Sequence, residues 1–289
     1  MSTVPAGRYD LHTHSIASDG TWAPSRIVEQ AAAGGLAGIA LTDHDTTAGW
    51  AEARDAAQRE GIGFLPGIEL TTKVQGRSVH LLGYLIDPED PGIRRITEQV
   101  RSARVGRART MVERLGRDFD IGWDDVTEGF SDGATIGRPH IADALVRRGY
   151  FADRSAVFRE ILHPASPYYV TNEAVETHEA VRIVWEAGGA PVLAHPAAER
   201  MRRGFPTAIL RELVQEGLFG IELDHPENLP ERLPELRRAA EELGLALLGS
   251  SDFHGEGKIN RLGERTTDAS VVQRMVDAAH GTQPYFPAR

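Results

Sequence analysis

Short apolar segments alternate with alanine-rich helical patterns along most of this 289-residue chain, and this alternation limits the folds open to it. The segments predicted as strands are Tyr9–His12, Gly38–Thr42, Phe64–Leu70, Val79–Ile86, Pro191–Ala194, Gly220–Leu223 and Leu245–Gly249. The helical patterns cover Pro24 to Gly34, Thr46–Arg59, Ala174–Ala187, Phe205–Glu216 and Glu231–Leu243. Alternating strands and helices favour a parallel α/β architecture. Seven such units predict a distorted or incomplete α/β barrel.

One block interrupts the alternation between about Arg94 and Val170. An arginine-rich helical pattern from Arg94 to Arg117 is followed by an acidic stretch, Asp118–Asp132, which is predicted to be a loop. A further helix is predicted from Arg138-Pro139 to Gly149, because proline favours the first turn and glycine the position after the last. The sequence therefore predicts a barrel formed by residues 1–100 and 175–289, with a helical insert at 101–174.

The composition excludes several kinds of chemistry. The chain has no cysteine, so disulfides, thiolate nucleophiles and cysteine-ligated zinc are excluded, whereas it has 11 histidines. A net charge of −10 makes duplex DNA and anionic membranes poor non-specific partners. The sequence shows neither a secretion signal nor an apolar run of about 18 residues that could span a membrane. We therefore expect a cytoplasmic protein; its oligomeric state is open.

Histidines and carboxylates gather where the predicted strands end. The first strand ends in His12-Thr13-His14, and residues two apart in a strand project to the same side, so both imidazoles can reach one metal ion. The further candidates are Asp19, His44, Glu69, His80, His195, Asp252 and His254. Except for His80, which the register can place nearer a strand start, they follow the carboxyl ends of strands, where α/β barrels carry their chemistry. These nine residues are predicted metal ligands.

Other polar residues near these ends receive a structural interpretation. Asp43 is interpreted as a partner that orients a ligand rather than as a ligand. Glu222 and His225 are interpreted as packing or rim residues, and Lys258 as a solvated loop lysine. His163, His178 and His280 lie on predicted helices or loops and are interpreted as surface or packing residues.

With these motifs, the chain resembles the polymerase-and-histidinol-phosphatase (PHP) superfamily over about residues 8–100 and 175–270. The resemblance implies a distorted seven-stranded, TIM-like barrel with a trinuclear metal centre. It also implies three groups of ligands. One ion would be held by His12, His14, Glu69 and Asp252. A second would be held by Glu69, His80 and His195, and a third by Asp19, His44 and His254.

Nine nitrogen and oxygen ligands suit two or three divalent ions, and manganese, zinc and iron all accept this mixture. Such ions make the site cationic within an acidic protein, so an anionic phosphate can bind there. A water bridging two ions loses its proton near neutral pH and can attack a phosphoester as hydroxide. Catalysis is assigned to Asp19, His44, His195 and His254; which group protonates the leaving oxygen stays open.

The insert contains a second candidate site at Arg138-Pro139-His140. A helix start presents free N–H groups to an anion, and Arg138 can add a bidentate contact, although an ordinary helix start with an exposed arginine fits the spacing equally well. The segment resembles one in a PHP subgroup that includes bacterial nucleoside 3′,5′-bisphosphate phosphatases and 5′-to-3′ oligoribonucleotide exonucleases. That resemblance implies that the insert caps the active site and that Arg138 and His140 hold a second phosphate.

The leading hypothesis is a metal-dependent phosphoesterase. Its substrate would be a nucleoside 3′,5′-bisphosphate, or short RNA degraded from its 5′ end. A first alternative is a phosphatase for another small phosphomonoester, such as histidinol phosphate. A second alternative, from a different class, is a metal-binding regulatory module without catalysis.

Overall fold

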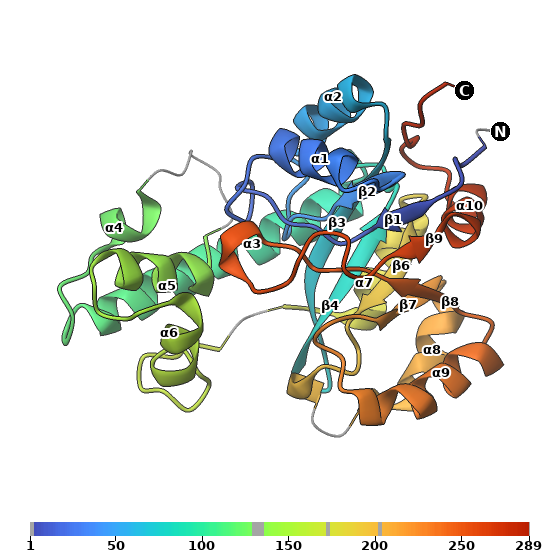
Figure 1. Cartoon of the computed structure of the whole chain (residues 1–289). Coiled ribbons are helices and arrows are strands. Elements are labelled where there is room, and N and C mark those ends of the chain that lie inside the picture. Colours follow the sequence, from blue (N-terminus) through green and yellow to red (C-terminus); the bar gives the residue numbers. More distant parts are fainter. Residues whose placement is uncertain (1–2, 129–135, 172–173, 202–203, 289) are drawn as a thin grey trace. The chain divides into compact units, whose positions relative to one another are not determined.

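The computed structural model describes residues 3–128, 136–171, 174–201 and 204–288, and its chain forms two compact units (Figure 1). The first unit comprises Met1–Thr97 and Val175–Arg289, and the second comprises Glu98–Ala174. Residues 129–135, which include Thr135 and the end of the acidic stretch, lie outside the described part. No described helix combines the length and the apolar character needed to cross a membrane.

The first unit is built on a barrel-shaped sheet. Its strands are β1 Arg8–Asp10, β2 Gly38–Leu41, β3 Gly63–Val74, β4 Arg77–Tyr84, β5 Val175–Glu176, β6 Ala190–Ala194, β7 Gly220–Asp224, β8 Ala246–Gly249 and β9 Thr267–Asp268. They follow the order β8-β7-β6-β4-β3-β2-β1-β9, with β5 paired to β3. The Thr267 hydroxyl donates to the Gly249 carbonyl and accepts from its N–H, which links the two ends of the sheet. The predicted distorted TIM-like barrel is confirmed.

Strand β4 differs from the parallel arrangement predicted for it, because it runs antiparallel to both β3 and β6. The cause is the two-residue turn between β3 and β4. Gln75 and Gly76 both have positive φ, 50° and 74°, as a tight hairpin turn of the primed type requires. The start of β4 therefore lies at the same barrel end as the carboxyl ends of the parallel strands, and His80 lies near that start.

Alternate strand residues form the interior of the barrel. Apolar side chains from β1, β2, β3, β4, β6 and β8, among them Leu65 and Leu82, form one buried cluster. Glu69 lies four residues beyond Leu65, on the same face of β3, and pairs directly with Leu82. His80 pairs with Ala194 of β6 in the same way. The interior is therefore apolar at one end and polar at the carboxyl end of the parallel strands.

Helices cover the outside of the sheet. They are α1 Pro24–Ala33, α2 Trp50–Glu60, α7 Thr177–Glu186, α8 Thr207–Gln215, α9 Leu233–Glu242 and α10 Ala269–Ala278, with short 3₁₀ turns at Glu199–Met201, Pro230–Arg232 and Gly255–Gly257. Ile27 and Val28 of α1 pack with Ala53 of α2 against Ile39 of β2 and Phe64 of β3. Figure 1 shows α1 beside α2, and α9 beside β7 and β8.

The second unit is helical in its described residues and has its own core. Its helices are α3 Pro91–Leu115, whose first residues belong to the barrel unit, α4 Trp123–Thr127, α5 Arg138–Arg147 and α6 Arg154–Glu160. Met111, Leu115, Ile141, Leu145 and Val157 are buried together. The acidic stretch is not wholly a loop, because α4 lies within it, and α5 begins one residue before Pro139.

Several element bounds differ from those expected. Strand β1 ends at Asp10, so the His12-Thr13-His14 motif follows the strand instead of ending it. Helix α2 begins at Trp50, four residues after the predicted start. Strand β9 and helix α10 were not expected, because β9 is only two residues long and its partner β1 is distant in sequence.

Replacing Leu82 with alanine should lower the free energy of unfolding by about 2–5 kcal/mol, because Leu82 is fully buried in the interior cluster. The matched control is Ile259→Ala, whose side chain is 95% exposed; it should change the free energy by no more than about 0.5 kcal/mol. Urea unfolding followed by circular dichroism measures both. Equal effects of the two substitutions would contradict this packing.

Candidate metal centre

The predicted ligands meet at the carboxyl end of the parallel strands. The potential ligand atoms form four groups, in each of which the atoms lie within 4.8 Å of one another. The groups are His12, His14, Glu69 and Asp252; His14, Asp19, His44 and His254; His44, Glu69 and His80; and His12, His195, Glu222 and His225. All nine predicted ligands occur among them, together with Glu222 and His225. Every member is buried except His80, which is half-buried.

The first group has the spacing of ligands around one ion. Glu69 Oε2 lies 3.3 Å from His12 Nε2 and 3.1 Å from His14 Nε2. Asp252 Oδ1 lies 3.4 Å and 3.3 Å from the same two nitrogens. Ligands about 2.1 Å from a shared ion stand roughly 3.0–3.4 Å apart in octahedral to tetrahedral geometry. These four side chains therefore fit a divalent ion.

Glu69 extends the site beyond this group through its other oxygen. Oε1 lies 2.6 Å from His80 Nδ1 and 3.3 Å from His195 Nε2. His44 Nδ1 lies 3.2 Å from Oε2, so His44 joins Glu69 and His80 in one group, which the implied ligand assignment did not foresee. The carboxylate of Glu69 is thus placed to bridge two ions.

The remaining predicted ligands gather around Asp19. Its Oδ1 lies 3.2 Å from His254 Nε2, and its Oδ2 lies 3.8 Å from His44 Nε2. His14 also belongs to this group, with Nδ1 3.7 Å from Asp19 Oδ1. The implied trio of Asp19, His44 and His254 is therefore brought together, with His14 beside it.

Unsatisfied nitrogens support metal binding here. The Nε2 atoms of His12 and His14 are buried and have no hydrogen-bond partner among the described residues. Such atoms are uncommon in folded proteins and call for a ligand or an ion. His12 Nδ1 donates to Glu222 Oε1 at 2.9 Å, and His254 Nδ1 donates to the Asp252 carbonyl at 2.9 Å. In the neutral ring, each of these histidines then keeps a lone pair on Nε2 for a metal ion.

The charges of the cluster also favour a cation. Burial by itself raises the pKa of the Glu69 carboxyl, but His44, His80 and His12 hold that pKa well below its usual range. Burial likewise opposes the lowered pKa of Asp252, which Lys258 and His12 produce. For His12, burial lowers the pKa, yet Glu222, Asp252 and Glu69 raise it well above the usual value. The ionised carboxylates therefore give the cluster a negative charge, which attracts protons or metal ions to the neighbouring imidazoles.

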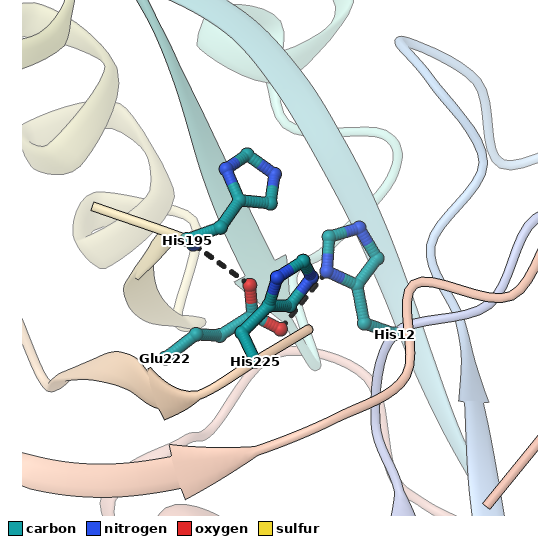
Figure 2. A group of neighbouring side chains, drawn as sticks. All are labelled: His12, His195, Glu222 and His225. Carbon is teal, nitrogen blue, oxygen red and sulfur yellow. Dashed lines mark hydrogen bonds and ion pairs between the residues drawn. The ribbon is translucent and has the colours of Figure 1, made fainter. Parts of the chain in front are cut away.

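Two carboxylates hold the ligands in place. Asp43 accepts hydrogen bonds from the Ser15 N–H and from the hydroxyls of Ser15 and Ser18, beside His14. This position agrees with the orienting role expected for Asp43. Glu222 was expected at the rim, but it is fully buried and accepts from His12 Nδ1 and from the His195 N–H at 3.0 Å (Figure 2). Only the fold brings Glu222 to His12, because 210 residues separate them.

The backbone is strained beside the cluster. His195 and Asp252 adopt positive φ, 32° and 54°, although neither is glycine, and so does Asp45, which follows His44. Such conformations cost about 1–3 kcal/mol each and concentrate at functional sites.

Lys258, interpreted from the sequence as solvated, instead pairs with Asp252 Oδ2 at 2.5 Å and with Glu227 Oε1 at 2.9 Å.

Arg138 and His140 belong to the second unit and begin α5. The Arg138 guanidinium lies over the rings of Phe158 and Tyr169, at 5.2 and 5.6 Å from their centres, and donates to the Leu162 carbonyl. His140 is buried, and its Nδ1 accepts from the Gly137 N–H at 3.0 Å. In the neutral ring Nε2 therefore carries the proton and is a donor.

Comparisons with known proteins agree with this site. A family model described as the PHP domain matches residues 10–152. The 3′,5′-nucleoside bisphosphate phosphatase of Chromobacterium violaceum is 35% identical over 92% of this chain and 94% of its own. A 5′-3′ exoribonuclease of Haemophilus influenzae is 30% identical over 86% of this chain and 90% of its own. The crystal structure of a proposed metal-dependent phosphoesterase from Bifidobacterium adolescentis superposes with a TM-score of 0.92, at 42% identity over 96% of this chain and 98% of that one.

The chain belongs to the PHP domain family. The names of these relatives also bear out the expectation of a hydrolase acting on phosphoester bonds. The predicted family and enzyme class are therefore confirmed.

Replacing Glu222 with glutamine should weaken metal binding by about 10- to 100-fold, because the amide no longer accepts from both His12 Nδ1 and the His195 N–H. Competition with a chromogenic chelator measures the affinity. Glu241→Gln, an exposed change on α9, is the control and should bind metal like the unchanged protein. Equal affinity in all three proteins would show that Glu222 does not support the ligands.

Proposed function

We propose that this protein is a metal-dependent phosphoesterase that dephosphorylates nucleoside 3′,5′-bisphosphates or releases nucleotides from the 5′ end of short RNA, in the cytoplasm. The observation that carries the proposal is the buried cluster of histidines and carboxylates around Glu69. The substrate class is supported by the names of the two relatives from Chromobacterium violaceum and Haemophilus influenzae, which align with most of this chain.

We propose that the nine predicted ligands hold two or three divalent ions, with manganese, zinc and iron all compatible with imidazole and carboxylate donors. Such ions would generate a nucleophile from water and neutralise charge on the phosphate oxygens. Glu69 would bridge two of the ions, since its two oxygens face different histidines. The residues next to the reacting phosphate would be Asp19, His44, His195 and His254.

The helical unit is proposed to hold a second phosphate. The Arg138 guanidinium can make paired hydrogen bonds to phosphate oxygens, and His140 can donate from Nε2 because its Nδ1 already accepts from Gly137. A substrate with one phosphate has no need for these contacts. For this reason we favour a bisphosphate or a 5′-phosphorylated oligonucleotide over histidinol phosphate, and propose that residues 101–174 cap the active site.

Phosphate release from adenosine 3′,5′-bisphosphate, adenosine 5′-monophosphate, a 5′-phosphorylated dinucleotide and histidinol phosphate tests the proposal directly. With metals loaded, we expect turnover of the bisphosphate or the dinucleotide, and loss of turnover after dialysis against a chelator. Turnover of histidinol phosphate alone would replace the proposed substrate class. Inactivity on all four compounds would remove the proposal.

Arg138→Ala should lower kcat/KM for the bisphosphate by about 10- to 100-fold, the effect of losing a charge-assisted contact of about 1.5–3 kcal/mol. Activity on a generic aryl phosphate should stay within about twofold of the unchanged enzyme. Arg159→Ala, an exposed arginine of α6 in the same unit, is the control. Equal losses on both substrates would contradict a second phosphate site at Arg138.

A further inference from the structure

His225 lies just after β7 and is as deeply buried as the predicted ligands. Its side chain has no exposed surface, and its Nε2 atom has no hydrogen-bond partner among the described residues. The ring centre lies 4.9 Å from that of His195 and 5.9 Å from that of His12 (Figure 2). A buried polar atom left unpaired costs about 1–3 kcal/mol, so its position calls for a partner that the described residues do not supply.

A backbone hydrogen bond determines which nitrogen of His225 carries the proton. The Glu227 N–H donates to His225 Nδ1 at 3.1 Å. A backbone amide can only donate, so Nδ1 must present a lone pair, the ring is neutral, and Nε2 bears the hydrogen. His12 and His254 have the opposite arrangement, because their Nδ1 atoms face the acceptors Glu222 Oε1 and the Asp252 carbonyl. His225 is therefore a donor where those two histidines offer lone pairs.

This tautomer disqualifies His225 as a ligand, although His12, His195, Glu222 and His225 have metal-like spacing. Metal binding at Nε2 would displace its proton to Nδ1, directly opposite the Glu227 N–H. Glu222 is also engaged, because its oxygens accept from His12, from the His195 N–H and from the Ser250 hydroxyl. The group of His12, His195, Glu222 and His225 is therefore held together by hydrogen bonds, and only the Nε2–H of His225 has no acceptor among the described residues.

The carboxylate of Asp252 lies close to this N–H but does not satisfy it. His225 Nε2 lies 3.8 Å from Asp252 Oδ2, beyond hydrogen-bond distance, and Oδ2 already accepts from Lys258. The other oxygen of Asp252 lies 3.4 Å from His12 Nε2, inside the first ligand group. The Nε2–H therefore lies next to the space in which ions and a phosphate group would be held.

We propose that His225 is a hydrogen-bond donor to a phosphoryl oxygen of the substrate, and not a metal ligand. The substrate part of this inference rests on the proposed phosphoesterase function, whereas the donor assignment rests on the contacts of the ring alone. A neutral donor suits this place, because it stabilises negative charge on an oxygen without competing with the ions for ligands.

Three substitutions of His225 distinguish a hydrogen-bond donor from a metal ligand. His225→Ala and His225→Phe remove the N–H, and His225→Gln replaces it with an amide N–H. All three should retain the metal content of the unchanged protein by elemental analysis, whereas His12→Ala should lose metal. His178→Ala, a partly exposed histidine on α7, is the control and should behave like the unchanged protein.

The His225 variants should bind phosphate more weakly and turn over substrate less efficiently. Calorimetric titration of inorganic phosphate into the metal-loaded proteins should show affinity about 10-fold weaker or more in His225→Ala and His225→Phe, with a smaller loss in His225→Gln. The value of kcat/KM should fall in the same order. Reduced metal content, or unchanged phosphate affinity and kcat/KM in the Ala and Phe variants, would overturn the proposal.

The tautomer is testable without any variant or activity. Long-range ¹H–¹⁵N spectra of the metal-free protein, labelled at histidine, should show the proton of His225 on Nε2 and a proton on Nδ1 of His12 and of His254. A proton on Nδ1 of His225 would refute the donor assignment. If the unchanged enzyme hydrolyses no phosphoester, the proposed function fails, while these spectra still decide the state of the ring.

Discussion

The carboxylate of Glu69 is the interaction on which the rest of the site depends. Its two oxygens lie within 3.3 Å of nitrogens from five histidines, of which four follow β1, β2 or β6 and one belongs to β4. These histidines are His12, His14, His44, His80 and His195. A buried negative charge in such surroundings is stable only because positively charged or metal-bound partners enclose it. The barrel supplies that enclosure by ending its strands at one place.

The reversal of β4 shows how backbone geometry serves this centre. A parallel strand would have carried His80 toward the apolar end of the barrel. The two-residue turn at Gln75-Gly76 reverses the chain, and the register then places His80 opposite Thr71 and Ala194. The strained backbones at His195 and Asp252 have a similar effect. Each adopts an unfavourable conformation at a position where the side chain must face the cluster.

Hydrogen bonds to Nδ1 divide the buried histidines by role. Glu222 and the Asp252 carbonyl accept from His12 and His254 and leave Nε2 lone pairs, whereas the Glu227 N–H leaves His225 with a donor. Residue type and spacing predict none of this, because a histidine looks the same in sequence whichever nitrogen is protonated. For that reason the sequence-based interpretation assigned Glu222 and His225 no role in the site.

The sequence by itself determined the barrel class, the PHP family and the nine residues that gather at one end of the strands. These features are local: an apolar run, a turn signal and a histidine at a strand end are all readable within a few residues. The tertiary structure alone decided the direction of β4, the sharing of His44 and Glu69 between groups, and the burial of Glu222 beside His12. Each of these depends on contacts between residues far apart in the chain, whose free energy no local pattern encodes.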